Sequence, residues 1–213
     1  MYKKLLKVTP QKRKTVFKLA RQGFYFTLLI VIVLALWKLS SSYGTETFAE
    51  YGIVENLQLG TLFLSTIVFL VGAKKSKIYR PISLALASLT AFCIIRELDS
   101  FFEQILPIIS WKFAYLFPGI ATLYAFKNRK NLIEPLFEFL SSFAFDLMFT
   151  AMIVFIPLAQ CIGHRPFITN SVGSSKNVFL IRRMAEESME LMAYVLIFLS
   201  AIEVYCGLLK KKN

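Results

Sequence analysis

The sequence is poor in the residues from which catalytic and metal centres are usually built. Among its 213 residues there are three cysteines and one histidine. The cysteines form no CxxC pair and no cluster with the histidine, so the sequence indicates neither a disulfide framework nor a zinc site. The patterns of a P-loop, a dinucleotide-binding turn, an HExxH zinc protease and a GxSxG hydrolase are also absent. None of these enzyme classes is therefore supported.

Glycine is scarce as well, with nine residues, and no internal repeat is evident. Secondary transporters are commonly built from repeated halves, with helices interrupted by glycine and proline. The sequence does not indicate that architecture.

Apolar residues, in contrast, are in excess. They make up 56% of the chain, phenylalanine alone accounts for 21 residues, and the mean hydropathy is +0.59. Soluble domains contain about 45–50% apolar residues, whereas a membrane-spanning helix needs about 20 residues that are mostly apolar. We therefore predict an all-α integral membrane protein, a bundle of about six transmembrane helices. The apolar segments are residues 23–39, 56–73, 81–96, 107–126, 136–160 and 188–208.

The basic residues gather before the first segment, in alternate connections and at the end of the chain. In a six-span topology all these places face one side of the membrane, and Lys and Arg in short loops favour the cytoplasmic side. We therefore predict that both termini are cytoplasmic and that the protein lies in the inner membrane of a bacterium. The expected parts are a basic N-terminal segment (1–22), a polytopic transmembrane domain (23–209) and a basic tail (210–213).

The basic N-terminal segment has two interpretations. Its cations set the topology and attract anionic lipid, by about 1 kcal/mol for each cation near the surface, or they dock an acidic cytoplasmic protein. The expected partners are thus the lipid bilayer and either a second copy of the chain or a cytoplasmic protein. Basic residues spread over several loops argue against nucleic acid. The candidate docking residues are Lys12, Arg13, Lys14, Lys18 and Arg21.

Most of the thirteen acidic residues fall on the opposite side, in three clusters next to predicted helix ends. One cluster surrounds Glu55 at the start of the second segment, one is the RELD sequence at residues 96–99, and one at residues 186–190 opens the sixth segment. The helix dipole favours carboxylates at the start of a helix. It accounts for the first and last clusters but not for RELD.

Helical spacing predicts that these clusters converge. Glu190 shares a helix face with Glu186 and Glu187, and ionisable residues within a bundle usually face its interior, because exposure to lipid is costly. Glu55, Glu97 and Glu190 are nearest to the apolar runs, and we expect them to meet below the outer surface. The candidate outer site comprises Glu55, Arg96, Glu97, Asp99, His164, Glu187 and Glu190.

Three interpretations of the outer site remain open. Carboxylate oxygens suit a divalent cation such as Ca²⁺ or Mg²⁺ or the headgroup of a lipid, and no other cofactor is predicted. Paired carboxylates also serve as general acids and bases. Alternatively, Arg96, Arg182 and Arg183 pair with the acids in a purely structural cap. The single histidine, His164, is either solvated in its loop or joins the acids.

Asp146 is a candidate polar residue inside the membrane, since it lies about ten residues from either end of the fifth apolar segment. An acid at that depth is a functional-site hypothesis by default. Glu138 lies eight residues earlier and is expected near the same face, and Glu203 lies in the inner part of the sixth segment.

These observations favour a small membrane protein that acts by binding, as a sensor or as the membrane subunit of a larger complex, rather than an enzyme. The first alternative is an enzyme that modifies a lipid or a lipid-linked glycan at the outer leaflet. The second is a channel or transporter for ions or small solutes, with Asp146 as its deep polar step.

Overall fold

The computed structural model describes residues 10–99, 101–102, 111–164, 166, 168 and 176–208. Every regular element within these ranges is helical, which confirms the all-α prediction. The chain divides into two compact units, Met1–Gly44 and Thr45–Asn213.

The first unit contains helix α1 (Pro10–Tyr43), with 34 residues and a length of about 51 Å. Pro10 occupies the first helical position, where its missing N–H costs nothing because that group has no partner inside a helix. The helix continues without interruption past residue 22, so the basic residues from Pro10 onward and the first apolar segment belong to one element.

The second unit begins with α2 (Ile53–Lys75), α3 (Arg80–Glu97) and α5 (Leu116–Lys127). It continues with α6 (Ile133–Leu140), α7 (Phe143–Ile153), α8 (Gln160–Gly163) and α10 (Lys176–Glu203). Short 3-10 segments at Gly44–Phe48, Trp111–Tyr115 and Arg129–Asn131 precede α2, α5 and α6. Two π-helical segments, Val154–Ala159 and Val204–Leu208, join α7 to α8 and extend α10.

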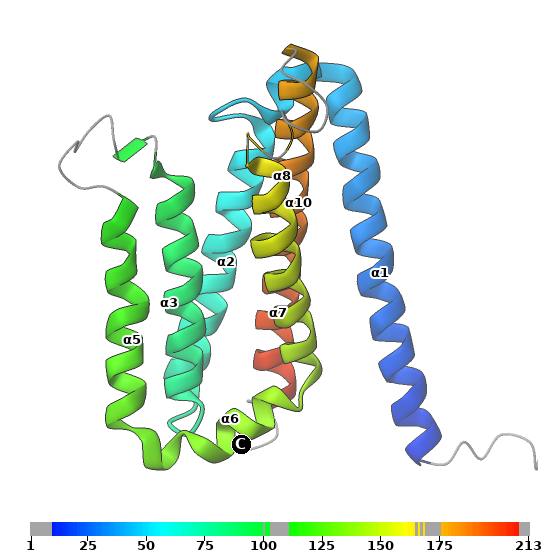
Figure 1. The fold of residues 1–213 in the computed structure, drawn as a ribbon. Helices are drawn as coiled ribbons and strands as arrows, with labels where there is room; N and C mark the ends of the chain where they lie inside the picture. The colour runs from blue at the N-terminus through cyan, green and yellow to red at the C-terminus, as the bar shows by residue number, and fades with distance from the viewer. Residues whose placement is uncertain are drawn as a thin grey trace, which may run out of the picture. The chain divides into compact units, whose positions relative to one another are not determined.

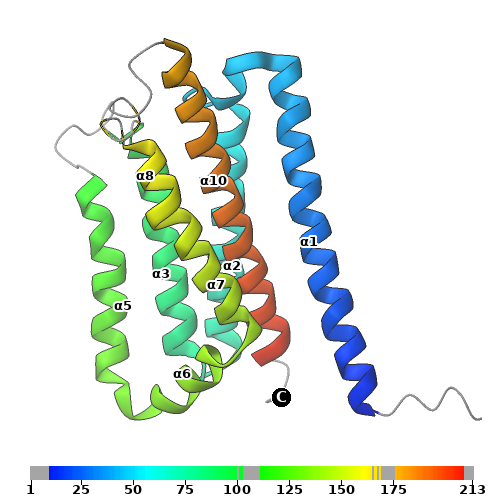
Figure 2. The same ribbon diagram turned by 45° about the vertical axis from the view of Figure 1, so that its right-hand side comes forward.

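Helix α10 is the centre of the second unit (Figures 1 and 2). It packs against α2 and against α7 and α8, while α3 packs on α2 and α5 packs on α3. Small polar side chains make contacts between helices: the Ser200 hydroxyl donates to the Ala144 carbonyl, and the Thr66 hydroxyl donates to Thr90 Oγ1, both at 2.7 Å. Small residues allow close approach of helices, which supports association where no hydrophobic effect acts between them.

Four helical stretches are long and apolar enough to cross a membrane. They are Thr15–Phe48, Ile53–Lys75, Phe143–Gly163 and Asn177–Gly207. Many of their large apolar side chains are exposed, among them Phe63 and Leu64 on α2. Such surfaces suit lipid tails, and the chain accordingly belongs with membrane-embedded all-α proteins.

The predicted fifth segment, 136–160, is broken by a turn. Helix α6 ends at Leu140 and α7 begins at Phe143, and the Ser142 side chain caps α7 by accepting a hydrogen bond from the Phe145 amide at 3.3 Å. Such a cap satisfies an amide that the first turn leaves without a partner. In both views α6 runs across the end of the unit rather than along α7 (Figures 1 and 2). Glu138 therefore does not share a helix with Asp146.

Helix α10 begins at Lys176, about three turns before the predicted start at residue 188. The apolar pattern misses these turns because five of residues 176–187 are charged and interrupt the apolar run. Residues 186–190 thus lie inside the helix, and the dipole explanation proposed for them is wrong. Glu55 does lie in the first turn of α2, where the dipole favours it.

Candidate functional site

The three acidic clusters meet at the end of the second unit where α2 begins and α3 ends. Their side chains line an open pocket of about 250 Å³. Carboxylates outnumber guanidinium groups seven to two in its wall, so the pocket carries a negative potential. The lining residues are Glu50, Glu55, Arg96, Glu97, Asp99, Arg183, Glu186, Glu187 and Glu190.

Arg96 holds the two deepest carboxylates together. Its Nη2 lies 2.6 Å from Glu97 Oε1 and 2.7 Å from Glu190 Oε1. The hydroxyl of the fully buried Tyr194 donates to Glu97 Oε1 at 2.5 Å and lies 3.1 Å from Arg96 Nη2. The guanidinium also covers the Phe155 ring, 4.6 Å from its centroid. These contacts join α3, α10 and the π segment after α7 at the base of the pocket.

Two glutamines attach further helices to the acids of α10. The Gln160 amide donates from Nε2 to Glu190 Oε1 at 3.1 Å. The fully buried Gln58 donates from Nε2 to both the carbonyl and the carboxylate of Glu187, at 3.0 and 3.1 Å. Both acids are therefore held by an amide donor from a neighbouring helix, which fixes their direction relative to the pocket.

Two ion pairs along α10 lie at the rim. Arg182 pairs with Glu186 at 2.9 Å, and Arg183 lies 3.9 Å from Glu187. Arg182 also donates to the carbonyl of Gly163 at the end of α8. A side chain at Gly163 would overlap the Glu186 carboxylate in its present position, so Glu186 would have to move and its pair with Arg182 would be disturbed.

Buried polar atoms at the pocket lack partners among the described residues. They include one acceptor, Asp99 Oδ1, and one donor, Arg96 Nε. A buried polar atom without a hydrogen bond costs about 1–3 kcal/mol. The pocket can therefore take a ligand that donates a hydrogen bond to Asp99.

Six of the seven residues predicted for the outer site line this pocket. His164 does not: it is exposed after α8, and its amide donates to the Gln160 carbonyl at 3.0 Å. Gln58 and Tyr194 lie one turn from Glu55 and Glu190, so the same helical spacing points to them. Nothing in the sequence indicates Gln160 and Phe155, because helical spacing does not reveal how the stretch that carries them faces α10.

Asp146 is not placed deep in the unit. It is exposed in the first turn of α7, and the pocket lies at the opposite end of the α7–α8 stretch. The broken fifth segment explains the difference, since the apolar run that seemed to flank Asp146 on both sides belongs to two helices. The five predicted docking residues all lie on the first turns of α1, where Lys12, Arg13 and Lys18 are exposed.

The fold and the site together define a membrane-embedded, all-α protein with an acidic pocket at one end of its helical bundle. No family model matches the chain, and neither a curated protein nor a solved structure matches it. The function is therefore inferred from the geometry of the pocket.

Proposed function

We propose that the chain acts by binding a positively charged ligand in the acidic pocket, as a sensor or as the membrane subunit of a complex. The observation that supports it best is the pocket wall of seven carboxylates, together with the buried Asp99 Oδ1, which has no hydrogen-bond partner among the described residues. Arg96 already compensates Glu97 and Glu190. For the other five acids, the ion pairs among the described residues are those of Arg183 with Glu187, at 3.9 Å, and of Arg182 with Glu186, so the pocket favours a cation.

The cation has two chemical sources. A volume of about 250 Å³ is several times the ~30 Å³ that a water molecule occupies in the liquid, so there is room for a hydrated Ca²⁺ or Mg²⁺ ion. Among the described residues no three acidic, histidine or cysteine side chains are placed to coordinate a bare ion. The ammonium group of a lipid headgroup has room as well, and it supplies a hydrogen-bond donor for Asp99. Both ligands share one recognition chemistry: positive charge and hydrogen-bond donors that face carboxylate oxygens.

We further propose six spans, namely α1, α2, α3, α5, the α7–α8 stretch and α10, with both termini cytoplasmic in a bacterial inner membrane. The end of the second unit opposite the pocket supports this orientation, because the connection between α2 and α3 lies there with Lys74, Lys75, Lys77 and Arg80. This topology places the pocket at the outer leaflet and the basic start of α1 in the cytoplasm, where it meets anionic lipid or a partner protein.

Calorimetry on the purified full chain in detergent tests the proposal with CaCl₂, MgCl₂ and ethanolamine as separate probes. We expect one class of probe to bind. The Asp99→Asn/Glu187→Gln variant should bind it about tenfold or more weakly, since a hydrogen bond to a charged group contributes about 1.5–3 kcal/mol. Glu134→Gln is the matched control, because it removes an exposed carboxylate from the first turn of α6, away from the pocket.

The outcomes separate the two sources. Binding of Ca²⁺ or Mg²⁺ alone identifies a metal site, and binding of ethanolamine alone identifies a headgroup site. If no probe binds, or if the control loses as much affinity as the pocket variant, the acids form a structural cap and the proposal fails.

A second candidate function is an enzyme acting on a lipid at the same pocket. It is favoured by the carboxylates of Glu97 and Glu190, which converge on Arg96 and are both accessible from the pocket, an arrangement suited to acid–base chemistry. Comparing lipid profiles of cells that express the chain or its Glu190→Gln variant tests this alternative. Identical profiles at equal protein levels would reject it.

A further inference from the structure

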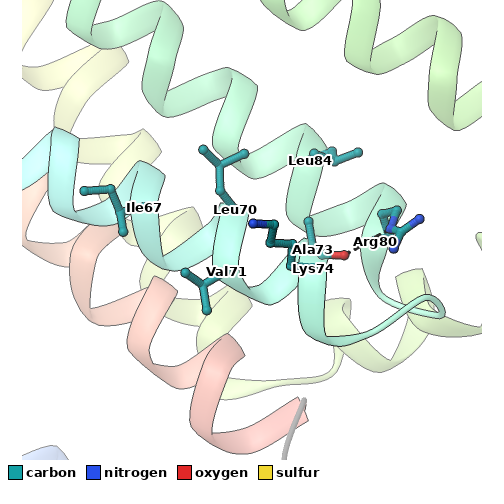
Figure 3. A pocket seen from close by; sticks show the side chains of 7 residues that line it. All are labelled: Ile67, Leu70, Val71, Ala73, Lys74, Arg80 and Leu84. Carbon is teal, nitrogen blue, oxygen red and sulfur yellow. Dashed lines mark hydrogen bonds between the residues drawn. The ribbon is translucent and has the colours of Figure 1, made fainter.

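The geometry points to a second site at the other end of α2 and α3, a groove that binds one anionic phospholipid molecule. A cavity of about 440 Å³ lies there, within the range of about 300–1,000 Å³ typical of small-molecule pockets. Figure 3 shows its wall. The lining residues are Ile67, Leu70, Val71, Ala73, Lys74, Arg80 and Leu84.

Most of the wall is hydrocarbon. Ile67, Leu70 and Val71 are 54%, 45% and 38% exposed and belong to a stretch long and apolar enough to span a membrane, and Leu84 faces them from α3. From Ile67 to Lys74 the helix rises about 10 Å. An acyl chain along this wall would cover exposed apolar surface on two helices at once.

Two cations border the apolar wall. Lys74 lies in the last turn of α2, and Arg80 is the first residue of α3. In Figure 3 the Lys74 amine reaches back beside Leu70, and the Arg80 guanidinium lies beyond Ala73. In the part of the chain that the structure describes, neither belongs to an ion pair. Both line the groove, which gives the site charge complementarity to a phosphate.

Arg80 is held in place by a hydrogen bond from its Nε to the Ala73 carbonyl, at 3.0 Å. The bond satisfies a carbonyl in the last turn of α2, which has no partner inside the helix. It fixes the guanidinium without using the two Nη groups, whose planar fork matches phosphate oxygens. The N-terminus of α3, which starts at the same residue and has no side-chain cap, adds a positive dipole end.

The combination selects an anionic phospholipid. An apolar wall alone would accept any acyl chain, and two surface cations alone would accept any anion. Together, at the boundary between an apolar span and a basic connection, they match a molecule that carries both parts. The inference does not depend on what the acidic pocket binds.

Native mass spectrometry of the purified full chain tests the inference by counting lipids retained from phosphatidylglycerol and from phosphatidylcholine with the same acyl chains. We expect the chain to retain one phosphatidylglycerol molecule, and to retain phosphatidylcholine far less often. The Lys74→Gln/Arg80→Gln variant should lose about fivefold in affinity for each cation, about 25-fold in all. Lys127→Gln/Arg129→Gln is the control, since it removes two exposed cations on α5 and the turn after it, outside the groove.

A third variant keeps the inference testable if the charge variant does not fold, as judged by its helical circular dichroism. Leu84→Trp fills the groove and leaves both cations in place, and it should also reduce bound phosphatidylglycerol to the phosphatidylcholine level. Equal retention of the two lipids by the unmodified chain would overturn the inference. So would equal losses in the groove and control variants, or undiminished phosphatidylglycerol binding by Leu84→Trp.

Discussion

Arg96 is the residue on which the acidic pocket depends most. Its side chain is 27% exposed, whereas those of Glu97 and Glu190 are 9% and 6% exposed. Replacing it by methionine keeps the stem but leaves two buried carboxylates next to each other without a cation. Removing one partner of a buried ion pair costs about 3–5 kcal/mol. We therefore predict that Arg96→Met markedly lowers the unfolding temperature of the purified chain in detergent.

Arg183→Met is the comparison for this prediction. Arg183 lies 3.9 Å from Glu187, and the Glu187 side chain is 20% exposed, so this pair is longer than those of Arg96 and its carboxylate is more accessible to water. Such a pair contributes about 0–1 kcal/mol. Adding Glu190→Gln to Arg96→Met should recover part of the lost stability, because it removes one unpaired charge. Equal losses for Arg96→Met and Arg183→Met would show that the buried network does not hold the pocket together.

For single residues, helical spacing predicts which side chains share a face of one helix, but it does not predict which faces of two helices contact each other. It predicted that Glu55, Glu97 and Glu190 approach one another from three apolar segments, and these residues do line one pocket. It could not predict that Arg96 faces Glu190, because that contact depends on the rotation of α3 against α10. It also could not exclude His164, whose position depends on where α8 ends.

Among the helices, the break between α6 and α7 depends on a small cap. Ser142 Oγ accepts a hydrogen bond from the Phe145 amide and lies 2.6 Å from the Phe139 carbonyl. Replacing an N-cap serine by alanine costs about 0.5–2 kcal/mol. We predict that Ser142→Ala lowers the free energy of unfolding by about this amount and therefore lowers the unfolding temperature of the purified chain.

Ser141→Ala serves as the control in the same assay. The Ser141 hydroxyl bonds only to carbonyls of its own preceding turn, Phe137 and Glu138, and does not cap α7. A smaller loss is therefore expected. If both variants lose the same stability, the cap does not determine where α7 begins.

The sequence predicts helix boundaries well where an apolar run ends abruptly at a proline or at charged residues, and poorly elsewhere. The third segment, 81–96, nearly coincides with α3 because a proline at its start and a charged cluster at its end mark both limits. The sixth lacks such marks at its start, since the first turns of α10 mix apolar residues with charged ones that pair along the helix, such as Arg182 with Glu186. The fifth has the pattern of one run because Ser141 and Ser142, whose hydroxyls are only mildly polar, hardly lower the local hydropathy.

For the molecule as a whole, the distribution of charge is the feature that relates fold to membrane. Acids line the pocket at one end of the second unit, and the basic connection between α2 and α3 lies at the other (Figures 1 and 2). Both candidate ligands follow this division, a cation at the acidic end and an anionic lipid at the basic end. The orientation of the chain in the membrane thus determines which ligand each end can meet, and this orientation can be measured.

The three native cysteines make that measurement practical. Cys161 is exposed on α8 near the acidic end, Cys206 is exposed in the π segment after α10 near the basic end, and Cys93 is buried. A variant that keeps only Cys161 should react with a membrane-impermeant maleimide on intact cells, because the proposed topology places the acidic end outside. A variant that keeps only Cys206 should react only after the membrane is permeabilised.

The variant that keeps only Cys93 is the control, since its thiol lies inside the unit and should react under neither condition until the chain is denatured. Reaction of Cys206 but not Cys161 on intact cells would reverse the orientation and place the acidic pocket in the cytoplasm, where free Mg²⁺ would be the more accessible cation. Reaction of both would contradict a spanning α10, because the two cysteines lie at opposite ends of helices that pack against each other. The labelling pattern therefore decides which leaflet can supply the pocket and the groove with their ligands.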